Sequence, residues 1–202
     1  MKINSNTVIV GEKIILVPYK KLHVEKYYRW MGDESILEQT ASERLTLEEE
    51  YENQQSWYED EHKITFIILD KDLLPNREWK SNLDDEKSMV GDVNIFFNEY
   101  EEEGTGELEI MIAEKNSRRK GIAREAINLI MHYAMEKLCP KTFIVKIGEE
   151  NQSSIELFKK LNFTQNGPAN VFKEINMTCP INDQLVQSYK SMHQNLRYLN
   201  WE

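Results

Sequence analysis

Cysteine is scarce in this sequence, and the two present, Cys139 and Cys179, belong to no CxxC or Cys/His cluster. Two cysteines cannot build a disulfide framework, so the pattern favours ordinary thiols in a reducing compartment. The four histidines are scattered without the spacing that metal ligands need. We therefore predict no metal site.

Long apolar runs are also missing. The first residues contain no apolar segment of the kind a secretory signal needs, and nowhere do about 18 apolar residues follow one another. We expect no membrane partner and a cytoplasmic location, with the nucleus as the alternative.

Basic charge is in deficit, because 25 Lys and Arg face 35 Asp and Glu, for a formal net charge of −10. This excess of acid argues against a non-specific nucleic-acid binder, which needs positive surface to meet phosphates. Apolar residues still make up 40% of the 202 residues, enough for the core of one domain. Eight acids and one base fall within 43–61. That segment is either a solvated helix face or an acidic rim that attracts a cationic substrate.

Hydrophobic periodicity predicts an α+β fold (mixed α/β), with strands dominating the first half and alternating with helices in the second. The charged stretch 99–104 is predicted to connect two strands of a hairpin. The predicted strands are 14–18, 65–69, 89–97, 108–113, 143–147 and 171–177, and the predicted helices are 20–31, 46–61, 121–138 and 152–161.

The division into domains follows from the last residues. We predict one domain over 1–180 and an appended helical tail over 181–202. The apolar residues of the tail recur four or three positions apart, which favours a helix folded back on the domain over a partner-binding helix. These residues are Leu185, Tyr189, Met192, Leu196 and Leu199.

The most informative stretch is LEIMIAEKNSRRKGIAREA, residues 108–126, in which a strand pattern leads through a polar turn into a strong amphipathic helix. Five basic residues lie between Lys115 and Arg124 with no acid among them. Gly121 and Ala123 allow close approach of a ligand to the backbone, and a helix N-terminus leaves amides unsatisfied. The segment therefore predicts a phosphate site, although it is neither a P-loop nor a G-x-G-x-x-G turn.

This stretch resembles the pyrophosphate-binding motif of the GNAT N-acetyltransferase superfamily. Residues 151–163, NQSSIELFKKLNF, are similar to the second cofactor motif of that superfamily, and residues 16–30 resemble the opening strand and helix of its N-terminal acetyltransferase branch. The resemblance covers about residues 8–178. It implies a twisted, mostly antiparallel central sheet that is splayed at a cofactor cleft and flanked by helices, with acetyl-CoA as co-substrate.

The resemblance also implies which residues contact acetyl-CoA. Backbone at 111–113 would pair with the pantetheine arm, and a bulge there would turn the Met111 amide toward the thioester oxygen, a catalytic role. Asn151 has a second interpretation as a helix N-cap. The implied cofactor-binding residues are Met111, Ile112, Ala113, Arg118, Arg119, Lys120, Gly121, Ile122, Ala123, Arg124, Asn151, Ser154 and Phe158.

Glu109 and Glu107 are the candidate general bases. Alternation along the strand places both on the same face, where the alternative role is an exposed carboxylate pair. Many members of the superfamily carry a tyrosine where this chain has Phe158, which cannot donate a proton. The thiolate then leaves unprotonated, or solvent or another group such as Tyr133 helps.

The predicted function is acetyl transfer from acetyl-CoA to a protein amine. An α-amine is favoured, because it is roughly 10–17% neutral at pH 7, whereas a lysine is about 0.04% neutral. A narrower resemblance, carried by residues 40–57 and 146–163, is to the tubulin-acetylating branch, which implies tubulin or microtubules as the protein substrate. The alternatives are a small-amine acetyltransferase and a non-catalytic scaffold that binds acetyl-CoA.

Overall fold

A computed structural model describes residues 2–97 and 102–201, so residues 99–101 of the predicted hairpin connection at 99–104 lie outside the described residues. The described part contains a nine-stranded sheet in the order β7-β8-β6-β5-β4-β3-β2-β1-β9. Among these strands β5 and β6 form the parallel pair, and the other neighbours are antiparallel, which confirms the mostly antiparallel sheet. The strands are β1 Thr7–Val10, β2 Ile14–Pro18, β3 Lys63–Asp70, β4 Met89–Phe96, β5 Thr105–Ile112, β6 Thr142–Gly148, β7 Thr164–Gln165, β8 Glu174–Pro180 and β9 Arg197–Asn200.

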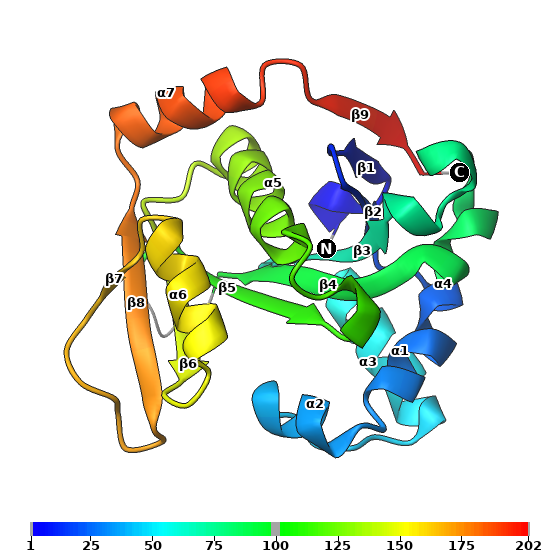
Figure 1. Ribbon diagram of the computed structural model, residues 1–202, viewed down its shortest axis with the longest axis horizontal. Coiled ribbons are helices and arrows are strands. Elements are labelled where there is room, and N and C mark those ends of the chain that lie inside the picture. Colours follow the sequence, from blue (N-terminus) through cyan, green and yellow to red (C-terminus); the bar gives the residue numbers. More distant parts are fainter. Residues whose placement is uncertain (1, 98–101, 202) are drawn as a thin grey trace.

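Helices cover both faces of the sheet, as the α+β prediction requires (Figure 1). α5, α6 and α7 pack on one face and share a core with inward residues of the strands. α1, α2 and α3 pack on the other face over a second, smaller core. The helices are α1 Val24–Trp30, α2 Glu34–Gln39, α3 Leu47–Glu59, α4 Asp85–Ser88, α5 Ile122–Lys137, α6 Gln152–Lys160 and α7 Asp183–Met192.

The start of α3 shows how local sequence sets these elements. Thr46 caps the helix by accepting a hydrogen bond from the Glu49 amide, and the Glu49 carboxylate accepts one from the Thr46 amide. This reciprocal pair satisfies two amides that a helix end would leave open. Of the acids in the 43–61 segment Glu50 is buried and the others are exposed, which is compatible with both interpretations of this segment.

Alternation divides the strand residues between the two cores. In β3, Ile64 and Phe66 face α5, whereas Ile67 and Leu69 face α1. Both faces of β3 are therefore buried, which explains its almost continuous apolar sequence. The sheet register shifts once between β3 and β4, where Val90 is the extra residue.

Three predictions were wrong, two of them at the C-terminal side. The strand expected at 171–177 is β8, Glu174–Pro180, and Val171 and Phe172 lie in the preceding loop, 91% and 78% exposed. The helix expected through the tail ends at Met192. Residues 197–200 instead form β9, because the edge of β1 offers a strand to pair with. The bulge expected on β5 is absent, since β5 pairs with β4 in regular register from Glu107 to Ile112.

Sequence periodicity also missed the short elements β1, α2 and α4. Within the described ranges, no helix combines the length and the apolar character needed to cross a membrane.

Candidate active site

The sheet opens between its two parallel strands. β5 and β6 pair from Thr105–Thr142 to Glu107–Ile144, and within the described residues no further pairs join them, although β5 continues to Ile112 and β6 to Gly148. We call this opening the β5–β6 seam. Backbone groups along the unpaired stretch of β5 can pair with an extended ligand as an added strand would.

The predicted phosphate turn lies beyond the end of β5. Gly121 is the N-cap of α5 with φ 84°, and Arg119 also has a left-handed backbone, with φ 62°. No side chain of the described residues caps the first amides of α5. A left-handed glycine directly before an uncapped helix of 16 residues leaves backbone donors exposed to an anion.

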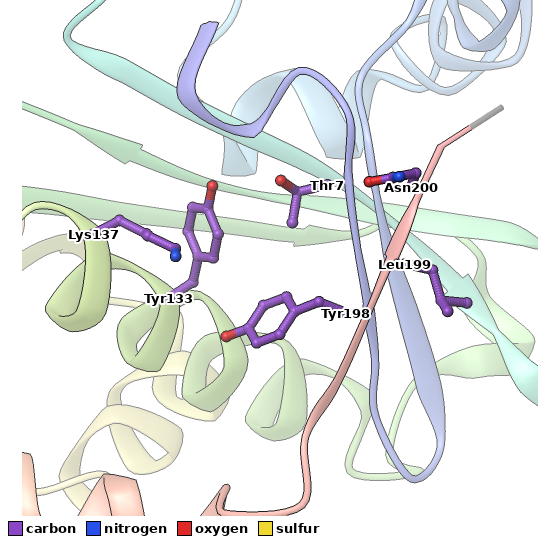
Figure 2. A pocket seen from close by; sticks show the side chains of 6 residues that line it. All are labelled: Thr7, Tyr133, Lys137, Tyr198, Leu199 and Asn200. Atoms are coloured by element: carbon purple, nitrogen blue, oxygen red, sulfur yellow. The ribbon is translucent and has the colours of Figure 1, made fainter.

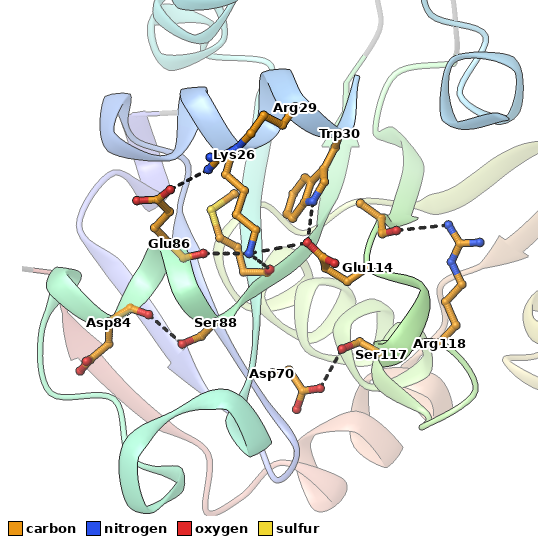
Figure 3. A network of polar contacts seen from close by, with 12 residues as sticks. Lys26, Arg29, Trp30, Asp70, Asp84, Glu86, Ser88, Glu114, Ser117 and Arg118 are labelled. Atoms are coloured by element: carbon orange, nitrogen blue, oxygen red, sulfur yellow. Dashed lines mark hydrogen bonds and ion pairs between the residues drawn. The ribbon is translucent and has the colours of Figure 1, made fainter. Parts of the chain in front are cut away.

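Buried and partly buried hydrogen bonds hold this turn against the sheet and α1 (Figure 3). Ser117 donates to Asp70 at the end of β3 with 3.0 Å between oxygens, and Lys120 pairs with the same carboxylate at 3.4 Å. The Trp30 indole of α1 donates to Glu114 at 2.9 Å. The turn is therefore held by the end of β3 and by α1 before any ligand binds.

The predicted basic residues divide into two groups. The Arg118 guanidinium donates to the carbonyl oxygen of Ile112 at 2.8 Å, so it braces the end of β5. Lys120 is held by Asp70, as described above. Arg119 and Arg124 are exposed, and in the described part of the chain they have no hydrogen bond or ion pair through their side chains. These two guanidinium groups are therefore the ones available to an anion at the turn.

The start of α6 provides the second predicted cofactor contact. The Asn151 side chain accepts a hydrogen bond from the Ser154 amide at 3.1 Å, so Asn151 is the N-cap that the sequence suggested as an alternative. Phe158 is 1% exposed and packs edge-on against Phe163, with 5.0 Å between ring centroids. Phe158 is thus part of the core, and its predicted contact with the cofactor stays a prediction.

A band of polar side chains crosses the opposite face of the sheet, the face that α1 and α3 cover. Cross-strand pairs place these residues side by side, because paired residues point to the same face: Asn94 with Glu109, Asp92 with Met111, and Phe96 with both Lys63 and Glu107. We call this set the polar band. It consists of Lys63, Asp92, Asn94, Glu107, Glu109 and Lys146.

The polar band reaches the seam through β5. Lys146 of β6 pairs with Glu107 at 2.8 Å, at the last rung where the two strands are joined. Glu109 lies two residues further along β5, beyond that rung, and its side chain is exposed. The protein around Glu109 displaces enough water to raise the pKa of its carboxyl, while Lys63 acts in the opposite direction. Glu109 therefore combines access to solvent with increased basicity.

Behind Glu109, Lys63 is almost completely buried. Its side chain is 2% exposed, and Nζ lies 3.1 Å from the centroid of the Trp57 ring and 3.8 Å from that of Phe96. Loss of hydration lowers the pKa of Lys63 to about 7, although Glu109 and Asp92 favour the charged form.

Asp92 is the second buried charge of the band, also 2% exposed. Its Oδ2 accepts a hydrogen bond from Asn94 at 2.6 Å, and its Oδ1 has no partner in the described part of the structure. Burial raises the pKa of Asp92 to about 7. Sequence reasoning missed both Lys63 and Asp92. The available signal was the alternation of Asp92 and Asn94 within an otherwise apolar strand.

Tyr133, the residue suggested as an alternative proton donor, lies elsewhere. Its hydroxyl donates to the Ile3 carbonyl at 3.0 Å. Figure 2 shows its ring beside a pocket of about 420 Å³ between α5, β1 and β9, away from the seam. The residues that line this pocket are Thr7, Tyr133, Lys137, Tyr198, Leu199 and Asn200.

Comparison with known proteins points to one family. Residues 13–164 match the family described as "Acetyltransferase (GNAT) domain". The chain is 60% identical over 216 residues to an N-acetyltransferase 9-like protein of Dictyostelium discoideum, with 100% of both chains covered. It is 46% identical over 185 residues to the alpha/beta-tubulin-N-acetyltransferase 9 of Mus musculus, covering 91% of this chain and 75% of the relative.

The fold is also that of solved structures. A spermidine N-acetyltransferase from Vibrio cholerae, solved in complex with CoA and spermine, superposes with a TM-score of 0.68 at 17% identity. The superposition covers 84% of this chain and 96% of that one.

Proposed function

Because the chain belongs to the GNAT acetyltransferase family and is an acetyl-CoA-dependent N-acetyltransferase, we propose that it acetylates the α-amine at the N-terminus of a protein. The observation that carries the proposal is the position of Glu109, an exposed carboxyl directly beyond the last rung between β5 and β6. The name of the mouse relative includes α/β-tubulin, and we extend the proposal to the N-termini of tubulin.

The cofactor fits the geometry of the turn and the seam. The left-handed Gly121 and the uncapped start of α5 suit a pyrophosphate, and the unpaired edge of β5 at 111–113 suits the extended pantetheine arm. Arg119 and Arg124 would add positive charge at the turn, and Asn151 and Ser154 would contact the arm from α6. When bound, acetyl-CoA supplies the acetyl group and a thiolate leaving group.

The acceptor amine must be neutral to react, so a residue of this chain has to remove its proton. An α-amine with a pKa of about 7.7–8.0 gives up its proton near pH 7 far more readily than a lysine with a pKa of about 10.4. A carboxyl such as Glu109, whose pKa is raised, is then a sufficient base. Glu107 is tied to Lys146 by an ion pair, so we assign it the smaller role.

Phe158 leaves no side-chain acid at the position where many relatives have tyrosine. Its ring is buried against Phe163, and the Tyr133 hydroxyl is bound to the Ile3 carbonyl. We propose that solvent protonates the leaving thiolate, because a thiol with a pKa near 8.5 is a good leaving group without an acid.

The test is acetyl transfer from labelled acetyl-CoA to a library of peptides that includes the N-termini of α- and β-tubulin, with products mapped by mass spectrometry. Products modified at the α-amine are expected. Preferred acetylation of lysine side chains or of polyamines would contradict the proposal.

Replacing the base gives the first mutational prediction. Glu109→Gln is expected to lower kcat/KM for a peptide acceptor more than about tenfold, because general bases contribute roughly 10²–10⁴-fold. The matched control is Glu107→Gln on the same strand face, for which we expect a smaller loss. Equal losses for the two variants would remove Glu109 from the assigned role.

A further inference from the structure

Lys63 and Asp92 are ionisable residues buried within the sheet. Both lie on strands at the centre of the sheet and both are 2% exposed. Burying a charge is costly unless it is paired and hydrogen-bonded. Lys63 Nζ lies over the rings of Trp57 and Phe96, and Asp92 keeps an oxygen without a partner among the described residues. Buried groups of this kind suggest a function in which they gain or lose a proton.

The two charges stand behind the proposed base. Asn94 pairs across the strands with Glu109 and donates to Asp92 at 2.6 Å, so one side chain separates the two carboxyls. Lys63 interacts electrostatically with both Glu109 and Asp92. The exposed Glu109 is therefore the outer member of a group whose inner members have little access to water.

We propose that Glu109, Lys63 and Asp92 accept the proton of the acceptor amine as one unit, in which Lys63 is a positioning residue that keeps the Glu109 carboxyl ionised until the amine binds. The inference rests on the proposed function and deepens it, since it assigns the regulation of basicity at the same site.

The charge balance of the unit supports this role. With all three groups ionised the unit carries one net negative charge, and one added proton makes it neutral, the state that a buried site favours. In the transfer, an N–H bond of the acceptor ammonium breaks and an O–H bond forms on the Glu109 carboxyl, which leaves a neutral amine. Because Glu109 is exposed, the proton then passes to solvent.

Other charged groups face the unit and influence the pH at which it exchanges a proton. Glu107 and Lys146 approach Glu109 from β5 and β6, and Glu50 of α3 faces Asp92. Asp60, at the C-terminal end of α3, faces Lys63. The pKa values of Lys63 and Asp92 both lie at about 7, so the unit can exchange a proton near neutral pH.

The test is the pH dependence of kcat/KM for one peptide acceptor in three variants. Lys63→Met removes the cation, so the pKa of Glu109 rises and the acidic limb moves up by about one pH unit, a tenfold loss on that limb. Asp92→Asn removes a negative charge that faces Glu109, so the pKa of Glu109 falls and the acidic limb moves to lower pH. Lys63→Arg is expected to restore the wild-type limb.

The matched control is Lys26→Met. Lys26 is also shielded and lies 5.5 Å from the centroid of the Trp30 ring, but it pairs with Glu114 outside the polar band. Lys26→Met is expected to leave the pH of the acidic limb of kcat/KM unchanged. Damage that is only structural would lower the whole curve of a variant without moving the limb, and that result for Lys63→Met and Asp92→Asn would overturn the inference.

A measurement without substrate separates the inference from the proposed function. NMR titration of the Lys63 side chain, assigned with Lys63→Met, is expected to give a midpoint near pH 7 that moves in Asp92→Asn. A midpoint near the ordinary lysine value of about 10.4 would overturn the inference even in an active enzyme. A wild-type chain that acetylates no peptide N-terminus would overturn the proposed function and, with it, the role assigned to the unit.

Discussion

At the scale of the residue, burial raises the pKa of Asp92 and thereby makes its contribution to stability depend on pH. The carboxyl has one hydrogen bond, from Asn94, and an oxygen without a partner in the described part of the chain. Its pKa of about 7 in the folded chain compares with about 3.9 in an unfolded one. Between these values the folded protein retains a proton that the unfolded chain has lost. Stability from this group is therefore present at low pH and lost as the pH rises toward 7.

We expect Asp92→Asn to remove this pH dependence. Near pH 4 the protonated carboxyl and the amide are nearly isosteric, so the two proteins should have similar free energies of unfolding. At pH 8 the variant should be more stable, by at most about 4 kcal/mol, the equivalent of roughly three pKa units. Urea unfolding from pH 4 to 8 measures the difference. A difference that stays constant with pH would contradict the raised pKa.

At the scale of the element, the turn between β5 and α5 depends on one backbone conformation. Gly121 has φ 84° and lies in the region that residues with a Cβ rarely adopt. A bulky side chain would also fill the space where the pyrophosphate is proposed to bind. We expect Gly121→Trp to abolish acetyl-CoA binding in calorimetry while the circular dichroism spectrum is retained.

The control for this substitution is Gly167→Trp. Gly167 has a similar φ of 73° and, among the described residues, no heavy atom within 4 Å of the point that a Cβ would occupy, but it lies in the β7–β8 loop. Both variants carry the same backbone strain of about 1 kcal/mol. Loss of binding in Gly121→Trp with normal binding in Gly167→Trp is therefore the expected pair of results. Normal affinity in both would exclude the turn as the phosphate site.

The elements themselves were largely predictable, because most of them depend on local sequence. The capping box at Thr46 and the apolar stripe of α5 are visible in a few consecutive residues. β9 was not predictable, since its strand conformation comes from pairing with β1 near the other end of the chain. The buried polar band was missed for a related reason: a charged residue within a strand pattern does not reveal that a helix will cover it.

At the scale of the whole molecule, one buried carboxylate joins distant parts of the chain. Asp85 of α4 is fully buried and accepts hydrogen bonds from His23 at 3.0 Å, Trp79 at 2.6 Å and Trp201 at 2.9 Å. His23 Nδ1 accepts from the Lys20 amide, so its proton is on Nε2 and points at Asp85. Trp201, which follows β9, is thus linked to α4 and, through Asp85, to His23 directly before α1.

We expect Trp201→Phe to lower the free energy of unfolding by about 1.5–3 kcal/mol, the contribution of a hydrogen bond to a charged group. The matched control on β9 is Tyr198→Phe, which removes an exposed hydrogen bond to Glu136 and should cost at most about 1 kcal/mol. Urea unfolding at pH 7 measures both. Similar small effects would show that Asp85 does not fasten the segment.

The pairing of β1 with β9 also has a consequence for the order of folding. The two strands lie nearly the whole chain apart in sequence, so their contact closes a very long loop. The seam and the turn are built from residues that are close in sequence, between β4 and α6. During synthesis the half of the sheet that contains the seam can therefore assemble first, while the outer edge of β1 stays unpaired until residues 197–200 have been made.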